Sequence, residues 1–403
     1  MSTSRIIAWI VWVVASIFYA YQYVLRVMPN IMLDDIMLQF NFDAASFGQF
    51  SGIYYIGYSL MHLPIGLMLD RYGPRKIMTL CILMTVLGLM PIVWAEHWVY
   101  PIIGRALIGI GSSAAILGTF KIIRMTFKEA HFTRMLSFSV TIGLLGAMYG
   151  GAPVSYMSEV LGYQKVVEIF AAIGVALAIA TYLIVPEIKE HHTTSVTMDI
   201  KQVFSNGKVM WLCVMAGLMV GPLEGFSDVW GTAFFKTVYG FDNTLAASLP
   251  SMIFIGMCFG GPALSFIGER TGNYLGTIIG AAVAMSIVFW ILLSGLLSPF
   301  TISVGLIIVG VSCAYQILAI YKASTYVHES VAGLTTAVAN MIIMIFGYGF
   351  HATIGFVIKA AGGPSAHNAY VYGIAVIPIT LVLSVIGLIP LIMKDRKAAT
   401  TLT

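Results

Sequence analysis

The stretch Gly66-Leu-Met-Leu-Asp70-Arg71-Tyr-Gly73-Pro-Arg75-Lys76 lies between two long apolar segments. Four of its eleven residues are charged, in a chain with only 9% charged residues. Its glycines allow two helices to turn closely, and its basic residues hold the turn at an anionic headgroup surface. The stretch therefore predicts a short loop at a membrane surface, between two helices that cross the bilayer.

The composition of the whole chain excludes a soluble protein. Its 403 residues are 59% hydrophobic, whereas roughly a quarter of an average soluble domain is charged. Four cysteines are too few for a secreted disulfide scaffold. The 21 basic residues form no basic tract, and with 17 acidic residues the net charge is only +4. Both observations argue against nucleic-acid binding. We therefore expect an integral membrane protein with many spans.

Twelve apolar segments are each long enough to cross about 30 Å of hydrocarbon as a helix. The expected spans are 6–29, 46–69, 76–95, 98–123, 135–157, 165–186, 209–235, 244–268, 274–294, 300–325, 331–357 and 369–393. The polar stretch Glu187–Lys208 separates the first six spans from the last six. The expected fold is an all-α polytopic membrane protein, with an N-terminal six-helix bundle at 1–186, a cytoplasmic linker at 187–208 and a C-terminal six-helix bundle at 209–403.

Charges outside the spans predict the orientation of the chain. With the N-terminus inside, the inner segments hold Arg5, Arg71, Arg75, Lys76, Arg124, Lys128, Arg134, Lys189, Lys201, Lys208, Arg270, Lys394, Arg396 and Lys397. The outer segments hold mainly acids, namely Asp34, Asp35, Asp43, Glu96, Glu159 and Asp242, with Lys165, Lys236 and Lys359 as exceptions. This asymmetry satisfies the positive-inside rule. It predicts that both termini are cytoplasmic.

A degraded second copy of the loop follows the eighth span. It reads Ser265-Phe-Ile-Gly-Glu269-Arg270-Thr-Gly272-Asn and is offset by 199 residues from the first copy. Two pseudo-symmetric six-span halves with such an offset are typical of transporters built from parallel repeats.

The first loop resembles the G-x-L-a-D-R-x-G-R-[KR] signature of the major facilitator superfamily, and its position and the twelve spans agree with that family over essentially the whole chain. The resemblance implies that a contact made by this loop holds the cytoplasmic ends of the helices together. This contact breaks when the carrier changes state. The gating residues that it implies are Gly66, Asp70, Arg71, Gly73 and Arg75, with Glu269 and Arg270 in the second copy. The alternative is a basic loop that only sets topology.

Arg105 begins the string Arg105-Ala-Leu-Ile-Gly109-Ile-Gly111, which resembles the R-x-x-x-G-x-G motif of the same family. An arginine inside a span must pair with another group or reach water. We therefore add Arg105 to the expected gating residues.

Polar residues of the first span share one helical face. Tyr19, Gln22 and Arg26 follow i, i+3, i+7 spacing, and Tyr23 lies beside them. Such a face does not belong against lipid, so we expect these four residues to bind substrate. The alternative is that Arg26 extends to the outer interface.

The seventh span carries Glu224 and Asp228 at i, i+4. The repeat offset places Arg26 at a similar depth, and the family resemblance implies that the first and seventh spans face each other. Together they predict an Arg26 pair with Glu224 or Asp228 that closes an outer gate or binds a zwitterion. Because buried charges are costly, we expect Glu224 and Asp228 to carry protons and Glu224 also to contact substrate. The alternative is an acidic outer vestibule without a role in transport.

Later spans add further candidates for substrate binding: Tyr315 and Gln316 in the tenth span, and Asn340 and His351 in the eleventh. Lys121 and Lys322 lie 201 residues apart near the inner ends of their spans. The sequence leaves open whether these two lysines contact substrate or extend to the interface.

We therefore expect a monomeric secondary transporter, not an enzyme, that uses no cofactor or metal ion. No nucleotide-binding loop and no catalytic motif is present. The string from Tyr21 to Pro29 resembles the first helix of bacterial uptake members, which include organic-anion symporters and the amino-acid and nucleoside carriers of intracellular bacteria. The resemblance implies a location in a bacterial inner membrane. The expected activity is proton-coupled uptake of an amino acid, short peptide or organic anion by alternating access. The alternative is a proton-antiport exporter of drugs or siderophores.

Overall fold

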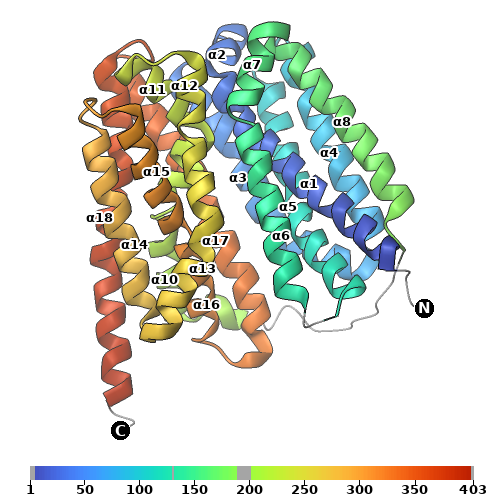
Figure 1. The fold of residues 1–403 in the computed structure, drawn as a ribbon, viewed down its shortest axis with the longest axis vertical. Coiled ribbons are helices and arrows are strands. Elements are labelled where there is room, and N and C mark those ends of the chain that lie inside the picture. Colours follow the sequence, from blue (N-terminus) through green and yellow to red (C-terminus); the bar gives the residue numbers. More distant parts are fainter. Residues whose placement is uncertain (1–4, 129–130, 188–200, 401–403) are drawn as a thin grey trace. The chain divides into compact units, whose positions relative to one another are not determined.

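The computed structural model describes residues 5–128, 131–187 and 201–400, and its regular elements in these ranges are helices (Figure 1). Among the residues that the structure describes, twelve helical segments are long and apolar enough to cross a membrane. Each end of each expected span agrees with them to within four residues. The all-α fold with twelve spans is therefore confirmed.

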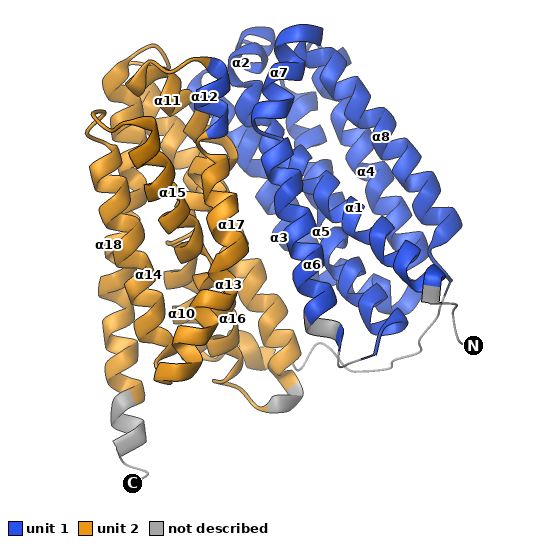
Figure 2. Ribbon diagram, viewed as in Figure 1, with its two compact units in different colours: residues 1–193, 243–248 blue, residues 194–242, 249–403 orange. Residues whose placement is uncertain are grey.

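The chain divides into two compact units (Figure 2). Unit 1 comprises residues 1–193 and 243–248, and unit 2 comprises 194–242 and 249–403. Residues 188–200 of the expected linker lie outside the described residues.

Unit 1 is built from long helices joined by short turns. They are α1 (Arg5–Ile31), α2 (Leu33–Phe40), α3 (Ala44–Tyr72), α4 (Pro74–Trp94), α5 (Val99–Thr126), α6 (Phe132–Tyr149), α7 (Ala152–Leu161) and α8 (Tyr163–Ile184). The expected fifth span is divided into α6 and α7 at Gly150 and Gly151. The expected loop between α3 and α4 turns at Gly73, whose φ of 82° favours glycine.

Unit 2 repeats this pattern with more interruptions. Its elements are α10 (Gly207–Gly217), the π-helix η2 (Gly221–Trp230), α11 (Gly231–Tyr239), α13 (Ser251–Thr271), α14 (Tyr274–Leu292), α15 (Pro299–Cys313), α16 (Tyr315–Ser324), α17 (Glu329–Ala360) and α18 (His367–Thr400). The short helix α12 (Asn243–Ser248), which begins the eighth span, groups with unit 1. The seventh span is thus three helices in succession, and the tenth is two.

Glycines on α3 and α5 let these two helices approach closely in unit 1. A Cβ at Gly57 would overlap the carbonyl oxygen of Ala106, and a Cβ at Gly109 would overlap that of Tyr54. Small residues at such contacts are typical of helix packing in membranes. Gly109, which the sequence places in a family motif, therefore acts here as a packing residue.

The same pair of contacts recurs in unit 2, between α13 and α15. A Cβ at Gly256 would overlap the carbonyl oxygen of Ile307, and one at Gly310 would overlap that of Ile253. These residues follow their unit 1 counterparts by 199 or 201 residues. The internal repeat therefore extends from the loop into the helix packing.

Candidate functional site

Arg26 of α1 is buried in unit 1, with 7% of its surface exposed. Its guanidinium lies 5.1 Å from the ring centroid of Tyr23 and 5.4 Å from that of Tyr55 on α3. The ring of Tyr19 packs edge-on against Tyr23 at 5.3 Å. Aromatic faces attract a cation, so Arg26 is held among rings and does not extend to the surface.

A second group of aromatic residues continues from this point along α3. The hydroxyl of Tyr54 donates a hydrogen bond of 2.8 Å to Oε1 of Gln22. The ring of Tyr58 stacks on Tyr54 at 6.0 Å, and the ring of His62 lies 5.2 Å from Tyr58. Because Tyr54, Tyr58 and His62 are four residues apart, they share one face of the helix.

Arg105 of α5 holds the backbone beside Arg26. Its guanidinium donates hydrogen bonds to the carbonyl oxygens of Leu25, at 2.5 Å, and of Arg26, at 2.8 Å. Pro29 has no N–H, so the Leu25 carbonyl loses its donor within the helix. Arg105 therefore replaces the missing donor and sets the position of the turn that carries Arg26.

We call these side chains the Arg26 cluster; its members are Tyr19, Gln22, Tyr23, Arg26, Tyr54, Tyr55 and Tyr58. The structure brings together the four residues of α1 that the sequence predicts. The tyrosines of α3 were missed, although the i, i+4 spacing of Tyr54 and Tyr58 inside an apolar span was a usable signal. A guanidinium held among tyrosine rings is suited to bind an anionic group, since it pairs with carboxylates in a bidentate manner.

The acidic residues of the seventh span lie on η2 in unit 2. Glu224 and Asp228 are both fully buried. Nε2 of Gln316, on α16, approaches Oε1 of Glu224 at 3.4 Å. The structure thus joins two residues that the sequence predicted separately. π-helical turns are rare and frequently occur at functional sites.

At the break between α10 and η2, backbone carbonyl groups accept hydrogen bonds from side chains of other helices. The hydroxyl of Tyr315 donates to the carbonyl oxygen of Ala216 at 2.7 Å, and Oγ of Ser384 donates to that of Met215 at 2.8 Å. The last carbonyls of a helix have no donor within it. Tyr315, expected to bind substrate, therefore supports the helix break through its hydroxyl.

Asn340 and His351 lie on α17, which packs against η2. His351 is fully buried, whereas Asn340 is half-buried. Phe350, beside His351, lies so close to Gly221 that a Cβ there would overlap its ring. The glycine thus allows α17 to approach the start of η2.

Three expected gating residues flank the turn between α3 and α4: Asp70 and Arg71 at the end of α3, and Arg75 at the beginning of α4. Oδ1 of Asp70 forms an ion pair of 3.1 Å with Nζ of Lys121 on α5. The guanidinium of Arg75 lies 4.3 Å from the ring centroid of Tyr182 on α8. The loop therefore ties the ends of α3, α5 and α8 together within unit 1.

The remaining gating candidates of the two loops differ in exposure. Gly66 is half-buried on α3, and Arg71 is exposed. In the second copy of the loop, Glu269 and Arg270 are exposed, and Arg270 lies 5.9 Å from the ring of Phe266.

Lys322, the repeat counterpart of Lys121, also forms an ion pair, but with a different element. Its Nζ lies 2.9 Å from Oδ2 of Asp395 on α18, and Nζ of Lys208 lies 3.2 Å from Oδ1. The hydroxyl of Tyr326 donates to Oδ2 of Asp395 at 2.6 Å. Burial and the Asp395 carboxylate raise the pKa of Tyr326, which keeps this donor protonated. We call these four residues the Asp395 cluster.

Comparison with known proteins places the chain in a family. The sequence model of the Major Facilitator Superfamily matches residues 11–352. A nitrite extrusion protein of Bacillus subtilis (strain 168) is 22% identical over 289 residues, which cover 70% of this chain and 68% of that protein.

Solved structures agree with the fold. The nucleoside transporter NupG matches with a TM-score of 0.72 and 15% identity, over 95% of this chain and 98% of that chain. A D-xylose–proton symporter matches with a TM-score of 0.69 and 13% identity, over 93% of this chain and 96% of that chain. A bacterial homologue of the human lysosomal transporter Spinster, in an inward-facing and unoccupied conformation, matches with a TM-score of 0.67 and 18% identity. The match covers 96% of both chains. Because the family model covers most of the sequence, this multi-pass membrane protein belongs to the major facilitator superfamily of secondary transporters.

Proposed function

We propose that this transporter takes up a small polar solute that carries a carboxylate group, together with protons, by alternating access. Amino acids, short peptides and organic anions all carry this group. The observation that carries the proposal is the buried Arg26, held by the rings of Tyr23 and Tyr55. A cation inside a membrane protein is costly and usually marks a substrate or ion pathway.

The Arg26 cluster supports a carboxylate ligand for chemical reasons. A guanidinium presents donors in a fixed fork that matches the two oxygens of a carboxylate. The tyrosine rings keep the guanidinium away from lipid without supplying a competing negative charge. Gln22, oriented by the hydroxyl of Tyr54, adds a neutral polar group beside the cation.

Proton coupling is assigned to Glu224 and Asp228. Both carboxyl groups are fully buried, and Gln316 is near Glu224. A carboxyl group that is dehydrated in one conformation and meets water in another binds and releases a proton. The pairing of Arg26 with Glu224 or Asp228 stays a prediction, which a zwitterionic substrate would explain best.

The Bacillus relative favours a second candidate, the export of a small inorganic anion. Its name describes the extrusion of nitrite, and the same cationic cluster suits a compact anion. This candidate reverses the direction of transport but keeps the role of Arg26.

A binding assay separates these candidates. Purified protein is screened by thermal shift against organic carboxylates, their neutral amides and nitrite. We expect stabilisation by a carboxylate, no stabilisation by its amide, and loss of the effect in Arg26→Gln. The exposed Arg124→Gln is the matched control. Equal stabilisation by an amide, or full binding by Arg26→Gln, would contradict the proposal, and a response to nitrite alone would favour the second candidate.

A further inference from the structure

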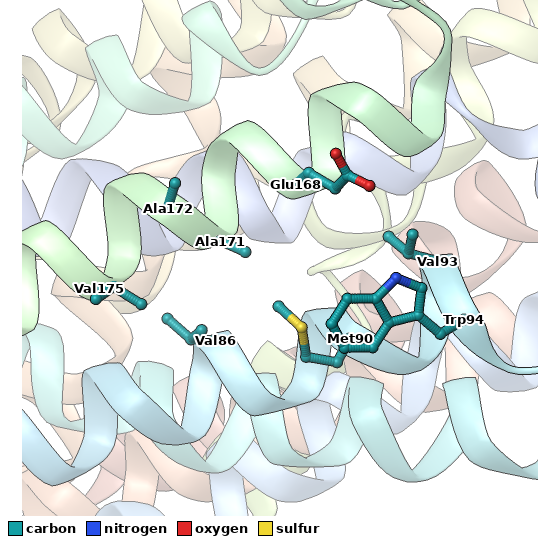
Figure 3. A pocket seen from close by; sticks show the side chains of 8 residues that line it. All are labelled: Val86, Met90, Val93, Trp94, Glu168, Ala171, Ala172 and Val175. Carbon is teal, nitrogen blue, oxygen red and sulfur yellow. The ribbon is translucent and has the colours of Figure 1, made fainter.

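A groove lies between α4 and α8 of unit 1, and none of its lining residues belongs to the Arg26 cluster. Its volume is about 260 Å³, and Figure 3 shows its lining side chains on the two helices. The residues that line it are Val86, Met90, Val93 and Trp94 of α4, and Glu168, Ala171, Ala172 and Val175 of α8. We call this feature the α4–α8 groove.

The faces beside the groove are those of a lipid-exposed surface. Leu87 of α4 and Ile179 of α8 are large, apolar and more than half exposed. In a chain that spans the membrane, such side chains face acyl chains. The groove is smaller than the 300–1,000 Å³ typical of sites for drug-sized ligands, so it has room for part of one acyl chain.

Polar groups gather at one end of the groove. Glu168 lines it, and its Oε2 forms an ion pair of 2.7 Å with Nζ of Lys165, near the beginning of α8. Trp94, largely exposed at the end of α4, stands at the same end, and tryptophan is enriched at the membrane interface. The groove thus runs from the hydrocarbon region to a paired positive and negative charge at headgroup level.

The apolar part alone does not select a ligand, because lipid chains are as apolar as the leucines around them. Selection therefore depends on the charge pair. A zwitterionic headgroup places a phosphate near Lys165 and an ammonium near Glu168. A primary ammonium has three N–H donors for the carboxylate, a quaternary ammonium has none, and an anionic headgroup is repelled by Glu168.

The internal repeat indicates that the groove is specific to unit 1. The 199-residue offset maps Val86 and Met90 of α4 onto Met285 and Phe289 of α14. Each of these is bulkier and buried in unit 2. Smaller side chains thus leave space in unit 1 at positions that larger side chains occupy in unit 2.

We propose that the α4–α8 groove binds one glycerophospholipid with a primary-amine zwitterionic headgroup. One acyl chain lies along the groove, the headgroup ammonium contacts Glu168 and the phosphate contacts Lys165. The charge pattern of the sequence predicts that this lipid belongs to the outer leaflet of the membrane.

Native mass spectrometry of the full chain tests the proposal. The protein is reconstituted with equal amounts of phosphatidylethanolamine, phosphatidylcholine and phosphatidylglycerol of identical acyl chains, then gradually delipidated. We expect one phosphatidylethanolamine to remain about fivefold more often than either other lipid, as one exposed charge-assisted contact allows. Glu168→Gln should abolish this preference, and Ala172→Phe, which fills the groove, should reduce retention of all three lipids.

Two matched controls separate the groove from the rest of the surface. Val160→Phe adds a ring at an exposed position of α7, and Glu159→Gln removes an exposed acid from the same helix; both should behave like the original protein. Equal retention of the three lipids, or an undiminished preference in Glu168→Gln, would overturn the proposal. A dimer that disappears in Ala172→Phe would also overturn it, because a second copy of the chain would then cover the groove. Glu168→Gln changes one exposed side chain near the beginning of α8 and should leave the fold intact. The headgroup preference can therefore be tested even if Ala172→Phe does not fold.

Discussion

Arg105 donates a hydrogen bond of 2.5 Å to the carbonyl oxygen of Leu25. This carbonyl is the one that Pro29 leaves without a helical donor. A second hydrogen bond joins Arg105 to the carbonyl oxygen of Arg26. A side chain of α5 therefore fixes the turn of α1 that carries the expected substrate-binding arginine.

Replacing Arg105 should weaken folding and transport together. Arg105→Lys keeps the charge, but an ammonium on a flexible stem does not reproduce the planar fork that reaches two carbonyls. We expect a loss of about 1.5–3 kcal/mol in stability, as for a hydrogen bond to a charged group. Chemical unfolding in detergent measures the loss, with Arg124→Gln as the control.

The role assigned to Pro29 gives a double-mutant cycle. Pro29→Ala restores an N–H for the Leu25 carbonyl, so Arg105→Gln should cost about 1 kcal/mol less in that background than in the original protein. Strict additivity of the two substitutions would mean that Arg105 and Pro29 act independently.

The repeated glycine contacts predict equal sensitivity in the two units. Gly109→Ala and Gly310→Ala should each destabilise the protein by about 1–3 kcal/mol, because the added methyl group meets a neighbouring helix backbone. Gly280→Ala and Gly349→Ala are the controls, because no atom lies within 4 Å of a Cβ at either position. Those two should be neutral or stabilising, since alanine favours helix. Thermal unfolding of the four variants measures the difference.

The Asp395 cluster predicts a contribution from the ends of α10, α16 and α18 to the stability of unit 2. Tyr326→Phe removes the donor that lies 2.6 Å from Asp395 and should cost about 1 kcal/mol. Asp395→Asn should cost more, because two lysines lose their partner. Lys76→Gln breaks an ion pair with Glu187 in which both side chains are substantially exposed, and it should change little. An equal loss in Lys76→Gln would show that burial does not distinguish the two sites.

The hydroxyl of Tyr54 should influence solute affinity more than folding. Tyr54→Phe keeps the ring that lies 4.9 Å from the Arg105 guanidinium but removes the hydrogen bond from the Tyr54 hydroxyl to Gln22. We expect about fivefold weaker binding of the transported carboxylate, as for one hydrogen bond of about 1 kcal/mol. Isothermal titration measures the change. Tyr72→Phe, at an exposed tyrosine, should bind normally; weaker binding in it as well would remove the argument for Tyr54.

The twelve spans are predictable from the sequence because each apolar segment has the length and composition of a span by itself. The repeat is predictable at the loops, where Asp70 and Glu269 stand at one offset. The interruption of the seventh span is different. Gly217, Gly221 and Pro222 were visible signals, but the break also needs the donors of Tyr315 and Ser384, which come from distant helices.

Only the part of the candidate site that lies on a single helix is predictable from the sequence. The face of α1 with Tyr19, Gln22 and Arg26 follows from helical spacing. The partners of Arg26 and Arg105 depend on how α1, α3 and α5 pack, which no single helix determines. The same holds for Lys121 and Lys322, which occupy repeat-related positions yet pair with acids on different elements.

The central claim is that buried carboxyl groups on η2 couple solute uptake to protons. Its most direct test uses the carboxylate that stabilises the protein most in the thermal-shift screen. Uptake of this solute is measured in proteoliposomes that are acidic outside and alkaline inside, with counterflow exchange measured in parallel. The original protein should accumulate solute above equilibrium and lose the accumulation with a protonophore. The Glu224→Gln/Asp228→Asn double variant should retain counterflow but only equilibrate the solute. Accumulation by the double variant equal to that of the original protein would contradict the account.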